Sequence, residues 1–318
     1  MKYLIILTGI ILLISLIVKY TLIKMDFMAN RNNTNTKNRK GTIKFIKNQE
    51  INNILIKINF KKYISQFNKN EVPYKIKNYK KYKSLLDGYI SNISDFTASE
   101  KKFIKKCVIN LNKFELVKKL DMIDWNIVKT NTNIEWGFSF TYDKYIFISE
   151  KTINMYNNNL QEMMKLLLHE QIHILQRKIQ STLDTNLYNK WNFIKPVISL
   201  DKALEDSIIT NPDGIDKYIF VSKNKRYYLP TLMLSSNGNV DEVAIEMITD
   251  DEKNFRNTYN MIDIDKIPHY ILSLGFDINQ DLYHPNEILA HHLSEMILNL
   301  VPKDHKITEI VNKIIKKN

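Results

Sequence analysis

Apolar residues recur at helical spacing in several segments of this chain. One run follows Thr97-Ala98-Ser99-Glu100, a pattern typical of a helix N-terminus, and its apolar positions are Phe103, Ile104, Cys107, Val108, Leu111, Phe114 and Leu116. Because Cys107 lies on that stripe, we interpret it as a core residue rather than a nucleophile. Apolar and polar residues alternate poorly over residues 50–67, which fit either a helix or a strand. We expect a mainly helical, basic region over residues 46–120.

Alternation of apolar and polar residues predicts strands later in the chain. Ile134–Ser149 fits a hairpin, and alternating runs surround a turn at residues 236–239, namely Tyr218–Ser222, Arg226–Leu229, Thr231–Ser235 and Val240–Ile248. Two more apolar runs at helical spacing cover Leu160–Ile179 and the residues that follow Pro285. Strands and helices in this arrangement predict an α+β fold with a mixed sheet, its main domain at residues 121–318.

The N-terminal segment is apolar on every face of a helix. Tyr3–Val18 contains no charge, and Tyr20–Ile23 beyond Lys19 brings the apolar length to the roughly 20 residues that span a bilayer. The apolar core of a cleavable signal peptide is shorter, about 7–15 residues. We expect a single-pass membrane anchor over residues 1–24, with secretion after cleavage as the alternative. The polar residues 25–45 are expected to form a flexible basic tether.

Composition excludes several classes of protein. Hydrophobic residues make up 44% of the 318 residues, too many for a wholly disordered chain, and a single Cys excludes a disulfide framework. The formal net charge of +12 first suggests a nucleic-acid partner. However, residues 1–120 hold 25 Lys+Arg and 7 Asp+Glu, a net of +18, whereas residues 121–318 hold 21 and 27, a net of −6. The excess positive charge therefore belongs to the N-terminal part of the chain.

This basic region contains one stretch that could contact an anionic polymer. Lys75–Lys83 interleaves lysines with Tyr79 and Tyr82, a mixture that can bind single-stranded nucleic acid through phosphate contacts and stacking. No nucleic-acid-binding motif accompanies it, so we interpret the stretch as a solvated helical face with its rings packed inward. Nucleic acid is not an expected partner. Attraction to anionic lipid near the anchor is the other use of the charge.

The segment that carries chemistry is His169-Glu170-Gln171-Ile172-His173, which follows the pattern H-E-x-x-H. On a helix, residues four apart share a face, so both imidazoles can reach one ion. Zinc lowers the pKa of a bound water to about 7, and the adjacent Glu170 can then take its proton. The alternative is a pair of hydrogen-bonded core histidines beside a salt-bridged Glu170.

A third protein ligand is needed for such a site. No His precedes His169, and four of the remaining five lie within His269–His292. In that stretch Glu287, His291 and Glu295 fall at i, i+4 and i+8 on one face of a predicted helix. Glu287 is our first choice as the third ligand and His291 our second. First-turn placement of a carboxylate at a helix N-terminus is the simpler explanation of Glu287.

With these residues the chain resembles zinc metallopeptidases of the gluzincin type, in which H-E-x-x-H on one helix is completed by Glu in E-x-x-x-D on a later helix. His169, Glu170, His173 and Glu287 match, whereas His291 stands where the family has Asp. The loose likeness to bacterial and large-virus peptidases covers about residues 120–300. It includes the hairpin before the motif, His173-Ile174-Leu175-Gln176-Arg177 and the turn Asn211-Pro212-Asp213-Gly214.

The resemblance implies a zincin-like fold and one Zn²⁺ held by His169, His173 and Glu287, with Glu170 as general base and then proton donor. His291 would accept a hydrogen bond from a ligating His, or bind the metal itself. The candidates for stabilising the transition state are Tyr283, His284 and His269. Gluzincin-like domains also hold the substrate backbone on a strand edge, for which Tyr145–Ser149 and residues 216–248 are the candidate regions.

We therefore expect a membrane-anchored zinc endopeptidase acting on a peptide or protein substrate. The alternative is a non-catalytic, membrane-tethered binding protein. In that protein the metal site would be structural, and the basic region would engage lipid or nucleic acid.

Overall fold

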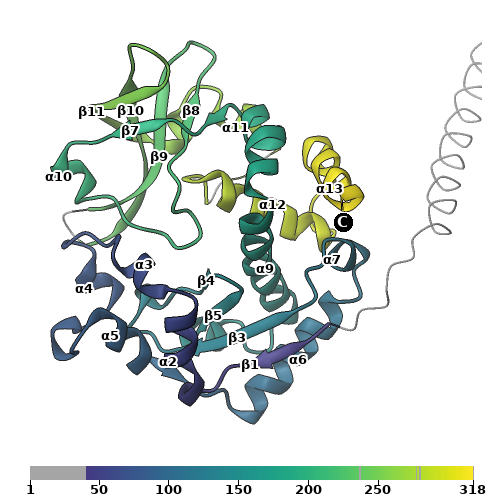
Figure 1. Ribbon diagram of the computed structural model, residues 1–318. Helices are drawn as coiled ribbons and strands as arrows, with labels where there is room; N and C mark the ends of the chain where they lie inside the picture. The colour runs from purple at the N-terminus through teal and green to yellow at the C-terminus, as the bar shows by residue number, and fades with distance from the viewer. Residues whose placement is uncertain (1–40, 236–237, 277, 279–280, 318) are drawn as a thin grey trace, which may run out of the picture. The chain divides into compact units, whose positions relative to one another are not determined.

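The computed structural model describes residues 41–235, 238–276, 278 and 281–317 (Figure 1). These residues belong to one compact unit that begins at Gly41. The predicted anchor, most of the predicted tether and part of the predicted turn at 236–239 lie outside the described residues. Within the described part of the chain, no helix is long and apolar enough to cross a membrane.

The fold is α+β and contains two mixed sheets. The first sheet has the order β1-β3-β5-β4, with β2 also paired to β3; β1, β3 and β5 are parallel, and β2 and β4 are antiparallel to their partners. Its strands are β1 (Ile43–Phe45), β2 (Ile93–Ser94), β3 (Trp125–Thr130), β4 (Phe140–Tyr142) and β5 (Tyr145–Ser149). The predicted hairpin is therefore confirmed in its second half, as β4 and β5.

Both faces of this sheet are covered, which explains why β5 is buried at all five positions. Alternate residues of β5 enter different cores: Ile146 and Ile148 join one cluster, whereas Tyr145 and Phe147 join another. Because β4 pairs with Tyr145–Phe147, this part of β5 has strand partners on both sides and offers no open edge to a substrate. Ile148 and Ser149 lie beyond the residues that pair with β4. Among the described strands, β4 stands at that end of the sheet.

Helices from the first part of the chain cover one face of the first sheet, as the prediction of a mainly helical region requires. Residues 50–67 are helical rather than extended. The helices that contribute to this core are α2 (Asn48–Lys57), α3 (Phe60–Ile64) and α5 (Leu85–Ser91), with α4 (Val72–Lys75) and the short 3₁₀ turn at Tyr79–Lys81 between them. Most lysines of this region therefore lie on the surface, outside the apolar core that these helices form.

The other face packs against a second group of helices, which includes the one that bears the motif. They are α6 (Ala98–Leu111), α7 (Glu115–Lys119), α8 (Glu150–Met155) and α9 (Leu160–Leu183). The predicted capping box is present at α6, where Thr97 Oγ1 accepts the Glu100 N–H at 3.2 Å and Glu100 Oε2 accepts the Thr97 N–H at 2.7 Å. Cys107 is fully buried in this core, and burial raises the pKa of its thiol to about 12.

The second sheet has the order β6-β8-β9-β10-β11-β7 and is antiparallel except for the pair β11–β7. Its strands are β6 (Phe193–Ile194), β7 (Val197–Ser199), β8 (Ile219–Val221), β9 (Tyr227–Leu234), β10 (Val240–Ile248) and β11 (Asn254–Asp263). The two runs predicted on either side of Pro230 form the single strand β9. Pro230 is tolerated because β8 pairs only with Tyr227 and Tyr228, so no ladder bond to β8 is missing.

The chain ends in two helices, α12 (Pro285–Ile297) and α13 (His305–Lys317), and α12 lies beside α9 (Figure 1). Leu168 and Ile172 of α9 share the largest apolar core with Ile288 and Leu289 of α12. This packing brings residues from two distant segments together. The remaining short helical segments are Glu135–Gly137, Asp184–Tyr188, Asn189–Trp191, α10 (Lys202–Glu205), Ile264–Lys266 and α11 (Tyr270–Leu274).

Candidate metal centre

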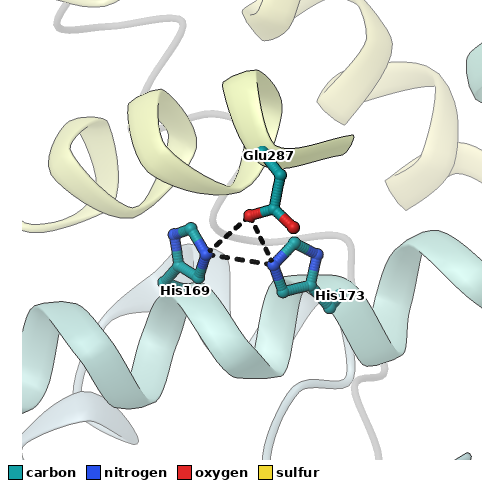
Figure 2. A group of neighbouring side chains, drawn as sticks. All are labelled: His169, His173 and Glu287. Atoms are coloured by element: carbon teal, nitrogen blue, oxygen red, sulfur yellow. Dashed lines mark hydrogen bonds and ion pairs between the residues drawn. The ribbon is translucent and has the colours of Figure 1, made fainter. Parts of the chain in front are cut away.

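The helix α9 is long and buried along most of its length, and it carries the H-E-x-x-H motif at its middle. It begins after Asn159, whose side chain accepts the backbone N–H of Glu162 at 3.3 Å, and it reaches Leu183 across a kink at Ile179, the last residue of the predicted segment. His169 and His173 are four residues apart on this helix and project from the same face (Figure 2).

The helix α12 starts at Pro285, which occupies the first turn, within one residue of the predicted start. His284 caps it: Nδ1 accepts the backbone N–H of Asn286 at 3.1 Å, while Nε2 lies 2.7 Å from the Asp216 carbonyl oxygen. This cap fixes the first turn of α12. Glu287 extends from that turn toward α9.

The ligand atoms of His169, His173 and Glu287 converge on one point (Figure 2). The His173 Nε2 atom lies 3.0 Å from His169 Nε2 and 3.3 Å from Glu287 Oε2, and His169 Nε2 lies 3.2 Å from the same oxygen. Ligands on a tetrahedral ion with bonds of about 2.0–2.1 Å would be about 3.3 Å apart. The three residues form a group that could hold a metal ion.

The electrostatics of this group suit a cation. Burial opposes charge on His173, but the carboxylates of Glu287 and Asp213 outweigh it and raise the pKa of His173 to about 10. Burial also opposes ionisation of Glu287, yet the neighbouring His173 and His169 hold the pKa of Glu287 well below its usual range. The site is thus arranged around a carboxylate that is stabilised by positive charge.

Glu170 lies beside the ligands and is almost fully buried. It is 4% exposed, and its Oε2 atom has no hydrogen-bond partner among the described residues. Burial, reinforced by the carboxylates of Asp213 and Glu287, raises the pKa of Glu170 well above its ordinary value. An unpaired buried carboxyl is costly unless something else in the site interacts with it.

Two amide side chains hold the ligands from behind. Gln176 Oε1 lies 2.8 Å from His173 Nδ1, so it can accept that N–H and leave Nε2 with a lone pair toward the ligand point. Gln176 also donates to the Asn286 carbonyl oxygen at 2.7 Å and thereby joins α9 to α12. Asn211 donates to Glu287 Oε1 at 2.9 Å, which leaves Oε2 facing the histidines.

A cavity of about 730 Å³ opens over this group. The three ligands and Glu170 line it, and so do residues of the first sheet, the 209–213 segment and α12; the members used below are Lys75, Glu135, Phe140, Glu162, Tyr283 and His291. The group that could hold an ion therefore lies in the wall of a sizeable cavity.

His291 lies in the cavity wall, but the group that could hold an ion does not include it. Its Nδ1 atom is 3.1 Å from Asp281 Oδ2, and its Nε2 atom is 3.5 Å from Glu295 Oε1. The amide that supports a ligating His is instead Gln176. One turn of helix places His291 beyond Glu287, alongside carboxylates rather than at the ligand point.

The three candidates for transition-state stabilisation lie in different places. Tyr283 lines the cavity, and its hydroxyl accepts a hydrogen bond from Asn211. Both ring nitrogens of His284 are engaged in capping α12 and contacting Asp216, so this residue is structural. His269 is exposed at the start of α11, in a left-handed backbone conformation, and does not line the cavity. Only Tyr283 is brought to the site.

Sequence reasoning did not assign roles to Gln176 or Asn211. Gln176 follows His173 by three residues, so helical spacing alone would have indicated that both lie on one face. Asn211 sits in the turn Asn211–Gly214, and nothing in its local sequence indicates that this turn meets α12.

Searches against protein-family models, curated proteins and solved structures found no match to this chain. Arguments about function therefore rest on its own residues.

Proposed function

We propose that this protein is a zinc-dependent peptide hydrolase with a zincin-like fold of the gluzincin kind. The observation that carries the proposal is the position of Glu170. It is a buried carboxyl with an unpartnered oxygen, adjacent in the chain to one ligand and lining the same cavity as all three. The apolar segment at residues 1–24, which lies outside the described residues, supports a membrane-anchored form of the enzyme.

The donor set fits zinc. Two imidazole nitrogens and one carboxylate oxygen are ligands that zinc prefers, and His₂Glu with one open position is an arrangement used for catalysis. When bound, such an ion acts as a Lewis acid, which lowers the pKa of a water molecule and polarises a carbonyl oxygen. His169, His173 and Glu287 would hold it.

Glu170 would move the protons of the reaction. As general base its carboxylate takes a proton from the attacking water, and as general acid it then returns that proton to the leaving amine nitrogen. Its raised pKa suits a group that must keep the proton between these two steps. Water thus adds across the amide bond with no other reactant.

Tyr283 is the best placed donor for the oxygen that becomes negative at the scissile carbonyl. Burial and the nearby Glu287 carboxylate raise the pKa of Tyr283 well above its ordinary value, so it keeps its proton at neutral pH. A protonated phenol can donate to an oxyanion, whereas a phenolate cannot.

The cavity also supports a peptide as the substrate. β4 stands at the end of the first sheet and contributes Phe140 to the cavity wall. A strand at a sheet end can pair with an extended peptide through its backbone, and this pairing orients the chain without depending on its sequence.

The alternative is a non-catalytic binding protein with a structural metal. Structural zinc sites are normally closed by four protein ligands. The group in the described part of the chain has three. Together with the unpartnered Glu170 oxygen, this count favours an open, catalytic site.

The test is the variant Glu170→Gln in the full chain. It should still bind one equivalent of zinc and should lose turnover of a fluorogenic peptide library by about 10²–10⁴-fold, the usual contribution of a general base. Glu162→Gln is the matched control, because Glu162 lies on α9 and lines the same cavity but is not part of the group that could hold the ion. Retained hydrolysis in Glu170→Gln would refute the mechanism.

A further inference from the structure

The segment that carries Asn211 is held by hydrogen bonds to two charged side chains from the helical region. The backbone N–H of Thr210 donates to Glu71 Oε2 at 2.8 Å, and its hydroxyl donates to Glu71 Oε1 at 2.9 Å. The carbonyl oxygen of Thr210 accepts from Lys75 Nζ at 2.5 Å. Every polar group of Thr210 is therefore bonded to residues far away in the sequence.

The two charged residues form a rigid clamp because both are buried and fully engaged. Glu71 precedes α4 and Lys75 ends it, and they are 1% and 2% exposed. Besides Thr210, the Lys75 ammonium donates to Glu135 Oε2 at 2.6 Å and to the Tyr63 hydroxyl at 2.9 Å. Its three N–H donors are all used, so Lys75 lines the cavity without a proton to offer a substrate.

Asn211, which follows Thr210, supports the candidate ligand Glu287. Asn211 Nδ2 lies 2.9 Å from Glu287 Oε1, while Glu287 Oε2 faces His169 and His173. Holding Thr210 at three points fixes where the Asn211 side chain begins. A shift of this segment would move the amide away from the carboxylate, and the carboxylate would then be free to rotate.

We propose that Glu71 and Lys75 are positioning residues of the metal centre, which hold Thr210 so that the Asn211 amide fixes the orientation of Glu287. The inference rests on the proposed metal site and not on hydrolysis. It gives the basic helical region a specific role, since two of its charged side chains reach inward to the site. The part of the chain before residue 120 is then needed for metal binding.

The test measures binding of Co²⁺, whose visible absorption reports the geometry of its ligands, to the full chain. Lys75→Met and Glu71→Gln should weaken Co²⁺ binding by about 3–30-fold and change the spectrum, as expected for residues that act through one intermediate. Asn211→Leu, which removes the direct contact, should weaken it by about 10–100-fold. All variants are compared under conditions in which circular dichroism shows them folded.

Lys129→Met is the matched control. Lys129 is also buried, at 5% exposure, and pairs with Glu100 at 2.9 Å, but it does not line the cavity. It should lose stability as Lys75→Met does and keep the wild-type affinity and spectrum. If Lys75→Met does not fold, Glu71→Gln decides the question, because it removes the charge while preserving the shape of the side chain.

A double-variant cycle identifies the route of the effect. If the clamp acts through Asn211, Lys75→Met should add little to the loss already caused by Asn211→Leu. Additive losses, or unchanged Co²⁺ affinity and spectrum in both clamp variants, would overturn the inference. Wild-type protein that fails to bind Co²⁺ would overturn the metal centre as well. Co²⁺ binding without peptide cleavage would count against the proposed hydrolysis alone.

Discussion

Two polar clusters line the same cavity, and they differ in how their charged groups are satisfied. The clamp cluster consists of Glu71, Lys75, Glu135 and their tyrosine partners, and the ligand cluster consists of His169, His173, Glu287 and Glu170. Both place charged groups where water is scarce, which is costly unless every group is satisfied. The clamp cluster meets that condition with protein groups alone, and the ligand cluster does not.

In the clamp cluster Lys75 pairs with Glu135, and the Glu71 carboxylate accepts hydrogen bonds from Asn68 and Thr210. Glu135 accepts from Lys75 and from the hydroxyls of Tyr63 and Tyr89, while Lys75 has no donor left over. The network holds Glu135 in a left-handed backbone conformation (φ 49°), which a residue with a side chain rarely adopts. A closed network of this kind fixes a shape beside the cavity.

In the ligand cluster three acceptor-capable atoms meet within 3.3 Å of one another, and one oxygen of Glu170 has no partner among the described residues. The difference between the clusters therefore lies in whether every buried polar group has a hydrogen-bond partner in the protein. A closed cluster supports the structure, whereas an open one is suited to bind something from outside.

The largest expected effect on stability comes from removing the positive charge of the clamp cluster. Lys75→Met should lower the free energy of unfolding by about 3–5 kcal/mol, because Glu135 would be left as a buried, uncompensated charge. Urea denaturation of the metal-free protein measures the loss. Adding Glu135→Gln should recover a large part of it, because the stranded charge is then removed.

The same measurement on the ligand cluster should give the opposite behaviour. Glu170→Gln in metal-free protein removes a carboxyl whose ionised form is disfavoured by burial, so it should be neutral within about 1 kcal/mol. A double variant of Lys75 and Glu135 that is less stable than either single variant would show that the clamp is not a compensated pair.

The sequence predicted the open cluster better than the closed one. His169 and His173 are joined by helical spacing, and Glu287 is expected from the chemistry of a third ligand, so local patterns were sufficient to nominate the residues that the structure brings together. Lys75 was interpreted as part of a solvated basic face, whereas it is 2% exposed. Its partners are Glu135 and Thr210, and no local pattern indicates pairings over such distances.

Secondary-structure elements, like the two clusters, were predictable only where local patterns define them. The helices α9 and α12 were predicted close to their observed bounds. The start of α6 was predicted by its cap, but the stripe that follows divides into α6 and α7. The strand β9 was divided in two at Pro230, and β11 was not predicted, because strand pairing depends on partners that are distant in the chain. The position of β5 inside the sheet, and not at its edge, is set by the same long-range pairing.

A third prediction separates the support of the ligands from the effect of burial alone. Gln176→Leu should weaken zinc binding by about 10–100-fold, because His173 would lose the acceptor that orients its ring and α9 would lose its bond to α12. Competition with a chromophoric chelator measures the change in affinity.

Gln171→Leu provides the control for that variant. Gln171 is a buried glutamine of the same helix, but it donates to the Asp124 carbonyl oxygen and does not line the cavity. Its replacement should cost about 1 kcal/mol of stability and leave zinc affinity unchanged. Equal losses of affinity in the two variants would mean that any buried polar group of α9 matters, and the distinction between ligand support and burial would disappear.

The smallest expected effect is the number of protons released when a metal binds. It tests whether the ligand cluster holds a proton that the metal ion then replaces. Burial opposes charge on His173, but the Glu287 and Asp213 carboxylates raise its pKa from 6.5 to about 10 in the metal-free fold. The fold thus stabilises the protonated form, and this contribution is complete below about pH 6.5 and lost as the pH rises to about 10. A metal ion requires the neutral imidazole.

Zinc binding near pH 8 should therefore release at least about one proton, and each unit of rising pH should strengthen binding about tenfold until the pKa is reached. Calorimetry in buffers of different ionisation enthalpy counts the proton, and the clamp variants Lys75→Met and Glu71→Gln should leave the count unchanged because neither residue touches His173. Binding without proton release would show that His173 is already neutral in the metal-free protein.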